Sequence, residues 1–249
     1  MRRVRRIRSA IRALVLAATV AACEGEPSIP SSDAPLIYLV LNQRTTAGTP
    51  PGQYAFVLTA GTVDKPLYRN AERFELRRHR DGALFAWRST GASGQAPGDY
   101  SGIASGSGNY FLPSAGTDGL GAKDIAAGES FDLVIETGGE VIRGSVTTPG
   151  PFALARDPSR PDRVVWPRVP GAVGYSVEIE GRTPPVLQVD TAVVIPSGRG
   201  DSVSVVVHAL DPQLFAFQTD ERLARSGLDN GYGVFGALTT ARLSFSESR

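Results

Sequence analysis

Apolar and polar side chains alternate along much of the chain, which is the pattern of β-strands with one buried face. The alternation is clearest around Asp81-Gly82, a dipeptide typical of two-residue hairpin turns. Such a loop pairs Arg80 with Ala83, and counting outward then sets Leu76 opposite Trp87. The predicted hairpin has one polar face and one apolar face, which consists of Phe74, Leu76, Phe85 and Trp87.

A second hairpin is predicted to turn at Gly138-Gly139, because apolar residues alternate on both sides of this pair. The same count pairs Ile135 with Ile142, Leu133 with Gly144 and Phe131 with Val146. Further strands are predicted at residues 36–41, 53–59 and 109–112. Together these elements predict an N-terminal β-sandwich domain over residues 35–148, with a polar Gly/Ser-rich loop at 89–108.

The proline-rich residues 149–162 are predicted to be a linker to a second domain, 163–249. The stretch "VVWPRVPGAVGYSVEIEG" resembles the second and third strands of a fibronectin type III sandwich. That resemblance implies that Trp166 and Tyr175 lie in the core of this domain. It implies a fold and no activity.

A helix is predicted at about residues 212–226, inserted before the last strand. Asp211 is a typical N-cap, Pro212 suits the first helical position, and Gly227 supplies a stop. Three apolar residues would face inward: Leu214, Phe217 and Leu223. The predicted fold class is therefore all-β, with two immunoglobulin- or fibronectin-like sandwiches and one inserted helix.

The first 22 residues have the composition of an export signal. Six arginines precede an apolar stretch that is too short to span a bilayer. Small residues then lead to Cys23, the only cysteine, as in the lipobox of bacterial lipoproteins, although Val20 stands where Leu is commonest. We expect a lipid on Cys23 and a flexible tether over residues 23–34; cleavage after Ala22 without lipidation is the alternative.

Removal of this signal changes the charge of the protein. Six of its 26 basic residues and none of its 25 acidic residues lie in the signal, so the remainder carries a net charge of −5. No basic patch predicts a nucleic-acid partner. Glu24, rather than Asp, after Cys23 resembles lipoproteins sorted to the outer membrane, on a face that the sequence leaves open.

Three glycines near the C-terminus, Gly231, Gly233 and Gly236, have the G-x-G-x-x-G spacing of dinucleotide sites. Such a site needs a strand before the glycines, a helix after them and an acidic residue about 20 positions later. Here a predicted helix precedes them, a predicted strand follows, and 13 residues remain. We therefore expect no nucleotide, and assign Asn230 and Gly231 to a tight turn and Gly233 and Gly236 to packing around Phe235.

No catalytic, cofactor or metal-binding group is predicted from residue spacing. His79 and His208 are expected to be surface or hydrogen-bonded residues, and no His/Cys cluster accompanies them. Trp87 and Trp166 could stack on a sugar ring if exposed, but their neighbours favour buried positions. A catalytic pair of acidic residues is defined by the distance between two carboxylates, which the fold sets rather than the spacing along the chain.

Four motifs resemble the domain of unknown function 4249 family of bacterial envelope lipoproteins. They are Asn109–Leu112, Gly128–Val134, Thr147–Pro149 and "NGYGVFG" at Asn230–Gly236. The resemblance covers nearly the whole mature chain and implies an envelope lipoprotein, with no catalytic residues to transfer. We expect a non-enzymatic module that binds an envelope protein or glycan; a hydrolase of glycans or peptides and a glycan-binding adhesin are the alternatives.

Overall fold

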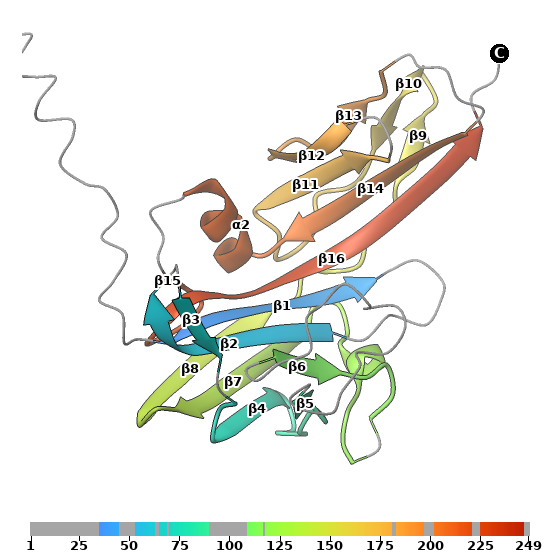
Figure 1. Ribbon diagram of the computed structural model, residues 1–249. Coiled ribbons are helices and arrows are strands. Elements are labelled where there is room, and N and C mark those ends of the chain that lie inside the picture. Colours follow the sequence, from blue (N-terminus) through green and yellow to red (C-terminus); the bar gives the residue numbers. More distant parts are fainter. Residues whose placement is uncertain are drawn as a thin grey trace, which may run out of the picture. The chain divides into compact units, whose positions relative to one another are not determined.

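The computed structural model describes residues 35–44, 53–62, 65–68, 70–89, 109–116, 118–180, 183–196, 202–220 and 225–246. All of them belong to one compact unit, Ser32–Arg249. Strands dominate this unit, which confirms the all-β fold class (Figure 1). Within the described part of the chain, no helix is long and apolar enough to cross a membrane.

One large sheet holds ten strands in the order β12-β11-β14-β16-β1-β2-β6-β5, with β15 paired to β16 and β3 to β2. Their bounds are β1 Leu36–Arg44, β2 Gln53–Thr62, β3 Lys65–Tyr68, β5 Arg88–Ser89, β6 Asn109–Leu112, β11 Gly174–Ile179, β12 Thr183–Gln188, β14 Ser202–Leu210, β15 Arg225–Ser226 and β16 Tyr232–Ser246.

Two three-stranded sheets accompany the large one. The first, in the order β4-β7-β8, consists of β4 Arg73–Arg78, β7 Ser130–Thr137 and β8 Glu140–Thr147. The second, in the order β13-β10-β9, consists of β9 Ala155–Asp157, β10 Arg160–Val165 and β13 Ala192–Val194. The described helices are the short 3-10 helix η3 Ala122–Asp124 and the α-helix α2 Pro212–Thr219.

Strand β16 is the common element of the two halves of the chain. It pairs in parallel with β1, from Leu36↔Tyr232 onward, and antiparallel with β14, from Leu210↔Leu238 to Ser202↔Ser246. Figure 1 shows its long arrow passing from the region of β1 to the far end of β14. One continuous sheet therefore passes through both of the predicted domains.

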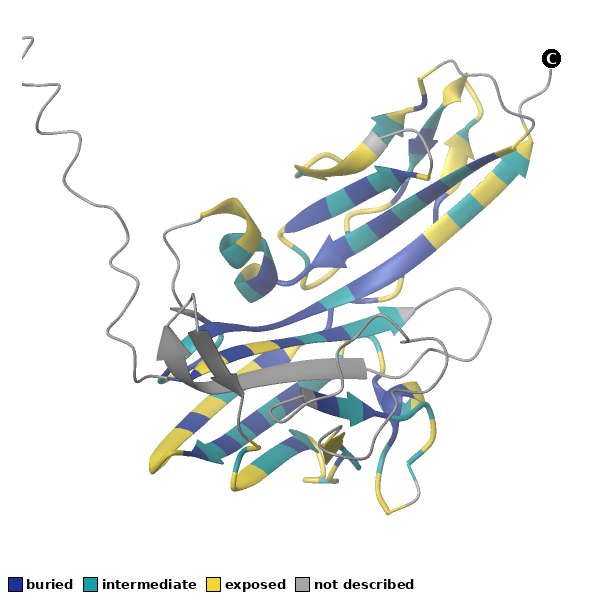
Figure 2. Cartoon of the chain, viewed as in Figure 1, coloured by how far each residue is buried: buried dark blue, intermediate teal, exposed yellow. Residues whose placement is uncertain are grey.

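The hydrophobic residues form two large clusters. One contains Phe131, Leu133 and Ile142 of the β4-β7-β8 sheet together with Leu39 and Phe235 of the large sheet. The other contains Val164 and Trp166 beside the β13-β10-β9 sheet, together with residues of β11, β14 and β16. Buried and exposed residues alternate along the strands that cover each cluster (Figure 2). Each cluster is thus enclosed in a sandwich-like manner by two sheets.

The hairpin at Gly138-Gly139 has the predicted register, with Ile135↔Ile142, Leu133↔Gly144 and Phe131↔Val146. The hairpin at Asp81-Gly82 does not. Phe85 N–H donates to Leu76 O at 2.9 Å, so Phe85, and not Trp87, lies opposite Leu76. The loop spans four residues, because Gly82 N–H bonds to Arg78 O and the Asp81 carboxylate accepts the N–H of Ala83.

This shift preserves the predicted apolar face. It moves the pairing by two positions, and side chains repeat every two residues in a strand. Leu76 and Phe85 are buried in the first cluster, and Phe74 and Trp87 pack against it.

The predicted helix at 212–226 is correct at its start and wrong at its end. Asp211 Oδ1 accepts the N–H of Leu214 at 2.8 Å, and Pro212 is the first helical residue. The helix ends at Thr219, and Arg225 and Ser226 instead pair in parallel with Gly233 and Val234 of β16. At these two positions, pairing with β16 thus takes the place of the predicted helix. Leu214 is buried and Phe217 half-buried, while Leu223 lies outside the described residues.

Residues 149–162, predicted to be a linker, carry secondary structure and core residues. They contain β9 and the first residues of β10. Phe152 and Leu154 are buried in the second cluster. This segment therefore packs as part of the folded unit. The Gly/Ser-rich loop lies, apart from Ser89, outside the described residues.

Candidate functional site

The glycine run near the C-terminus lies at a junction of backbone segments. Gly231 and Gly233 have φ angles of +76° and +97°, which favour glycine. A Cβ on Gly233 would stand 1.8 Å from Ile37 O, and one on Gly236 would stand 2.8 Å from Leu214 Cβ. Gly236 lies inside β16, beside α2, and the chain continues as strand. The glycines therefore allow β1 and α2 to approach β16, and Phe235 between them is fully buried.

Residues 229–232 connect the two sheets that cover the first cluster. Asn230 Nδ2 donates to Glu140 Oε2 at 2.8 Å, at the start of β8. Tyr232 N–H donates to Pro35 O at 2.9 Å, at the start of β1. The turn predicted at Asn230-Gly231 thus carries contacts to both sheets.

Trp166 and Tyr175 lie in the second cluster with their rings edge to face, 5.5 Å between centroids. The Tyr175 hydroxyl accepts the N–H of Val169 at 3.1 Å. Trp166 is 5% exposed, so its ring cannot serve as a sugar platform. Trp87 is half-buried and packs edge to face on Phe74, with 5.4 Å between centroids.

The two histidines do not meet. His79 is exposed, and its Nδ1 lies 2.7 Å from Asp132 Oδ2. His208 on β14 has its Nδ1 2.8 Å from Thr240 Oγ1. In the described ranges, no three His, Cys, Asp or Glu side chains are grouped as for a metal ion. Cys23 lies outside those ranges.

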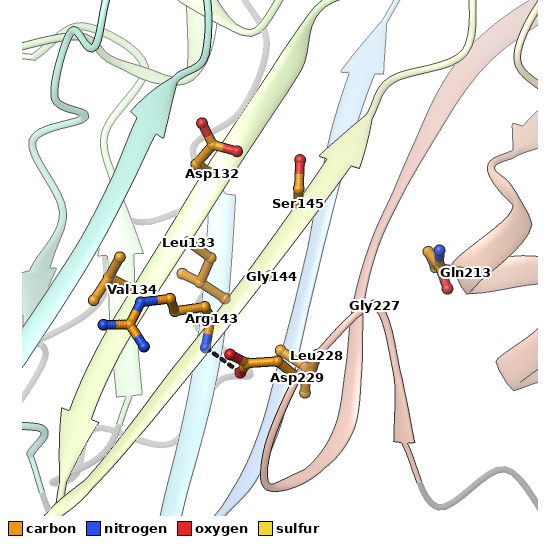
Figure 3. Close-up of a pocket in the computed structure, with 10 residues that line it drawn as sticks. All are labelled: Asp132, Leu133, Val134, Arg143, Gly144, Ser145, Gln213, Gly227, Leu228 and Asp229. Atoms are coloured by element: carbon orange, nitrogen blue, oxygen red, sulfur yellow. Dashed lines mark hydrogen bonds between the residues drawn. The ribbon is translucent and has the colours of Figure 1, made fainter.

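The best candidate site is an open depression of about 620 Å³ over the edge strand β8 (Figure 3). It is lined by Asp132, Leu133, Val134, Arg143, Gly144, Ser145, Gln213, Gly227, Leu228 and Asp229. Its volume is in the range of ligand pockets, although its form is open.

Gly144 is one of the residues that line this depression. It pairs with Leu133 in the β7–β8 ladder, and it carries no side chain. The neighbouring cross-strand pairs are Asp132↔Ser145 and Val134↔Arg143, whose side chains project from the opposite face. In Figure 3 Gln213 of α2 stands across from β8, and Gly227 and Leu228 lie between them. The site therefore combines four polar side chains of β7, β8 and α2 with exposed backbone.

Asp229 occupies part of the edge of β8. Its carboxylate Oδ1 accepts the N–H of Arg143 at 2.6 Å, and its own N–H donates to Arg143 O at 2.8 Å. This reciprocal pair imitates one step of a β-ladder. Beyond it the chain leaves the edge at Gly227, whose φ of +74° turns the backbone inward.

The charged side chains of the depression differ in whether they already have a bonding partner. Asp132 is paired with His79, and the Asp229 carboxylate is bonded to Arg143 N–H. The Arg143 side chain is exposed and makes no ion pair with any residue that the structure describes. The Gln213 side-chain oxygen accepts from Ser226 Oγ at 3.2 Å. The guanidinium is thus the group best placed to receive an anionic side chain.

No sequence motif marks these lining residues as a site. Gly144 was placed correctly in the hairpin, and an isolated glycine within a strand is a known sign of close backbone approach. That pattern is the one local indication of a close approach at β8. Gln213 and Asp229 follow Gly144 in the chain by 69 and 85 residues, and only the fold brings them to the same depression.

Comparison with protein-family models and with curated proteins found no match to this chain. The resemblance to the domain of unknown function 4249 family therefore stays a prediction from its motifs.

Proposed function

We propose that this protein is a lipid-anchored, non-enzymatic module of the bacterial cell envelope that binds or scaffolds a partner at the outer membrane. The observation that carries the proposal is the N-terminal sequence, in which an arginine-rich, short apolar segment ends in small residues before the only cysteine, Cys23. Residues 23–34 would tether the folded unit to the lipid.

The proposed partner site is the depression over β8. Its lining mixes backbone, one cationic, two anionic and several neutral side chains, as is usual in recognition surfaces with a polar rim. Envelope proteins and glycans both present such groups. The family resemblance and the all-β fold are consistent with this proposal.

The anchor is tested by Cys23→Ser, with Ser28→Ala as the matched control in the same segment. We expect Cys23→Ser to move the protein from the membrane fraction to the soluble fraction and to abolish incorporation of labelled palmitate. Ser28→Ala should remain membrane-bound and labelled. If Cys23→Ser stayed in the membrane fraction, the lipid anchor would be rejected.

A hydrolase is the second candidate, because Asp132 and Asp229 line the same depression. If a glycan or peptide bound there, these two carboxyl groups could act on it as general acid and general base. Their present bonds to His79 and to Arg143 N–H favour structural roles. Cleavage of a glycan or peptide that is lost in both Asp132→Asn and Asp229→Asn would establish the hydrolase instead.

A further inference from the structure

We propose that the depression binds an extended peptide segment, which adds as a strand to the free edge of β8 beside Ser145. This inference rests on the proposed binding function and names the chemistry of the partner. It depends on the direction of the main-chain groups of β8, on the space beside them and on the charge of Arg143.

The direction of these groups follows from the β7–β8 hairpin. Thr148 N–H donates to Glu129 O at 3.0 Å, so even-numbered residues of β8 direct their main-chain groups toward β7. Odd-numbered residues direct theirs to the outer edge. The bonds of Arg143 to Asp229 confirm this alternation.

Ser145 is the next outward position along this edge. β8 is the last strand of its sheet, and no described residue bonds to the Ser145 amide or carbonyl. Asp229 bonds to both main-chain groups of Arg143, with one acceptor and one donor, as a neighbouring strand would. A peptide beside Ser145 would continue the ladder that Asp229 begins.

The chain itself leaves this position open. Gly227 turns inward, and its carbonyl oxygen would stand 2.3 Å from a Cβ on Gly144. Gln213 lies across the depression of about 620 Å³ and can bond to a peptide main chain. The backbone that covers Gly144 from inside thus leaves the edge at Ser145 accessible.

Arg143 gives this edge a preference for charge. Arg143 and Ser145 are two residues apart on β8, so their exposed side chains lie on the same face of the sheet. An acidic side chain on the peptide would pair with the Arg143 guanidinium, while Asp132 is already paired with His79. The preferred ligand is therefore an extended peptide with an Asp or Glu.

The test uses Ser145→Pro, which removes the outward amide without removing a ladder bond to β7. Val141→Pro is the matched control, because Val141 is an outward, exposed position of the same strand that does not line the depression. Random heptapeptides displayed on phage are selected on the wild-type protein, and binding of the synthetic winners is measured to all variants. Thermal unfolding verifies that both proline variants fold.

We expect winners enriched in Asp and Glu, about tenfold or more weaker binding to Ser145→Pro, and less than twofold change with Val141→Pro. In an added strand only every second amide faces β8. N-methylation of that set of peptide amides should weaken binding about tenfold or more, and N-methylation of the other set should not. Failure to enrich any peptide, or equal binding to Ser145→Pro and wild type, would overturn the peptide site.

A separate arm distinguishes this inference from the binding function itself. Solubilised envelope is passed over wild-type protein and over Ser145→Pro. A glycan or protein retained equally by both would reject the peptide site while keeping the binding function. If neither retains anything above a column without protein, the binding function is rejected.

Discussion

At the scale of single residues, glycines decide how closely backbone segments approach. Gly236 has no strained φ, yet a Cβ there would stand 2.8 Å from Leu214 Cβ and 3.2 Å from its backbone. Its importance is therefore steric. Gly144 plays the same part on β8, where Gly227 O and the Phe235 ring fill the place of a side chain.

Gly236→Ala should displace α2 from β16 and lower the free energy of unfolding by about 1–3 kcal/mol, as for an overpacked site. Hydrogen exchange of the α2 amides measures the displacement. Gly128→Ala is the control, because a Cβ there meets nothing within 4 Å and only its φ of +77° is unfavourable. Unchanged exchange in α2 after Gly236→Ala would contradict this role.

At the scale of elements, helix α2 depends on a buried cap. Asp211 is 1% exposed, and burial raises the pKa of its carboxyl to about 6, although hydrogen bonds from the N–H of Leu214 partly oppose this. The unfolded chain has an ordinary Asp pKa near 4. The stabilisation linked to this group is therefore fully present below about pH 4 and is lost as pH rises to about 6.

Asp211→Asn should keep the cap and remove this pH dependence, since Asn caps helices as well as Asp. The free energy of unfolding is measured with urea at pH 4 and at pH 7. From pH 4 to pH 7 this free energy should rise in the variant, relative to wild type, by up to about 3 kcal/mol. Asp157→Asn is the contrasting control, because hydrogen bonds from Ser159 lower the pKa of Asp157, so that its contribution is lost only as the pH falls below about 4. If the free energies of unfolding of Asp211→Asn and wild type differed by the same amount at pH 4 and pH 7, the pH dependence would not come from the Asp211 carboxyl.

At the scale of the whole molecule, β16 couples the two hydrophobic clusters. Phe235 and Ala237 belong to the first cluster and Ala241 to the second, within one strand. Neither half can be removed without exposing part of the strand that covers the other. We therefore expect the described unit to unfold as one cooperative system.

The two tryptophans make this testable, because Trp87 packs against the first cluster and Trp166 lies in the second. Single-tryptophan proteins with Trp166→Phe or Trp87→Phe should show fluorescence transitions that coincide with their own circular-dichroism transitions. Phe131→Ala, in the first cluster, should shift the Trp166 transition as far as the Trp87 transition. Separate midpoints within one protein would show that the halves unfold independently.

Features with a local physical basis could be predicted from the sequence. Alternation and the Gly138-Gly139 turn specified the β7–β8 register, and Asp211-Pro212 specified the start of α2, because turn and cap chemistry act within a few residues. The end of α2 and the loop at Asp81 were missed, because pairing with β16 and side-chain bonds of Asp81 compete with local preference.

The remaining features depend on contacts between distant parts of the chain. That β16 joins both halves depends on pairing with strands that lie far away in the chain, and no local pattern encodes such a pairing. The depression likewise exists only because Gly227 and Asp229 meet Gly144 and Arg143 across more than 80 residues. Sequence periodicity shows which face of a strand is buried, whereas the folded chain determines which strand edges stay open and what lies beside them.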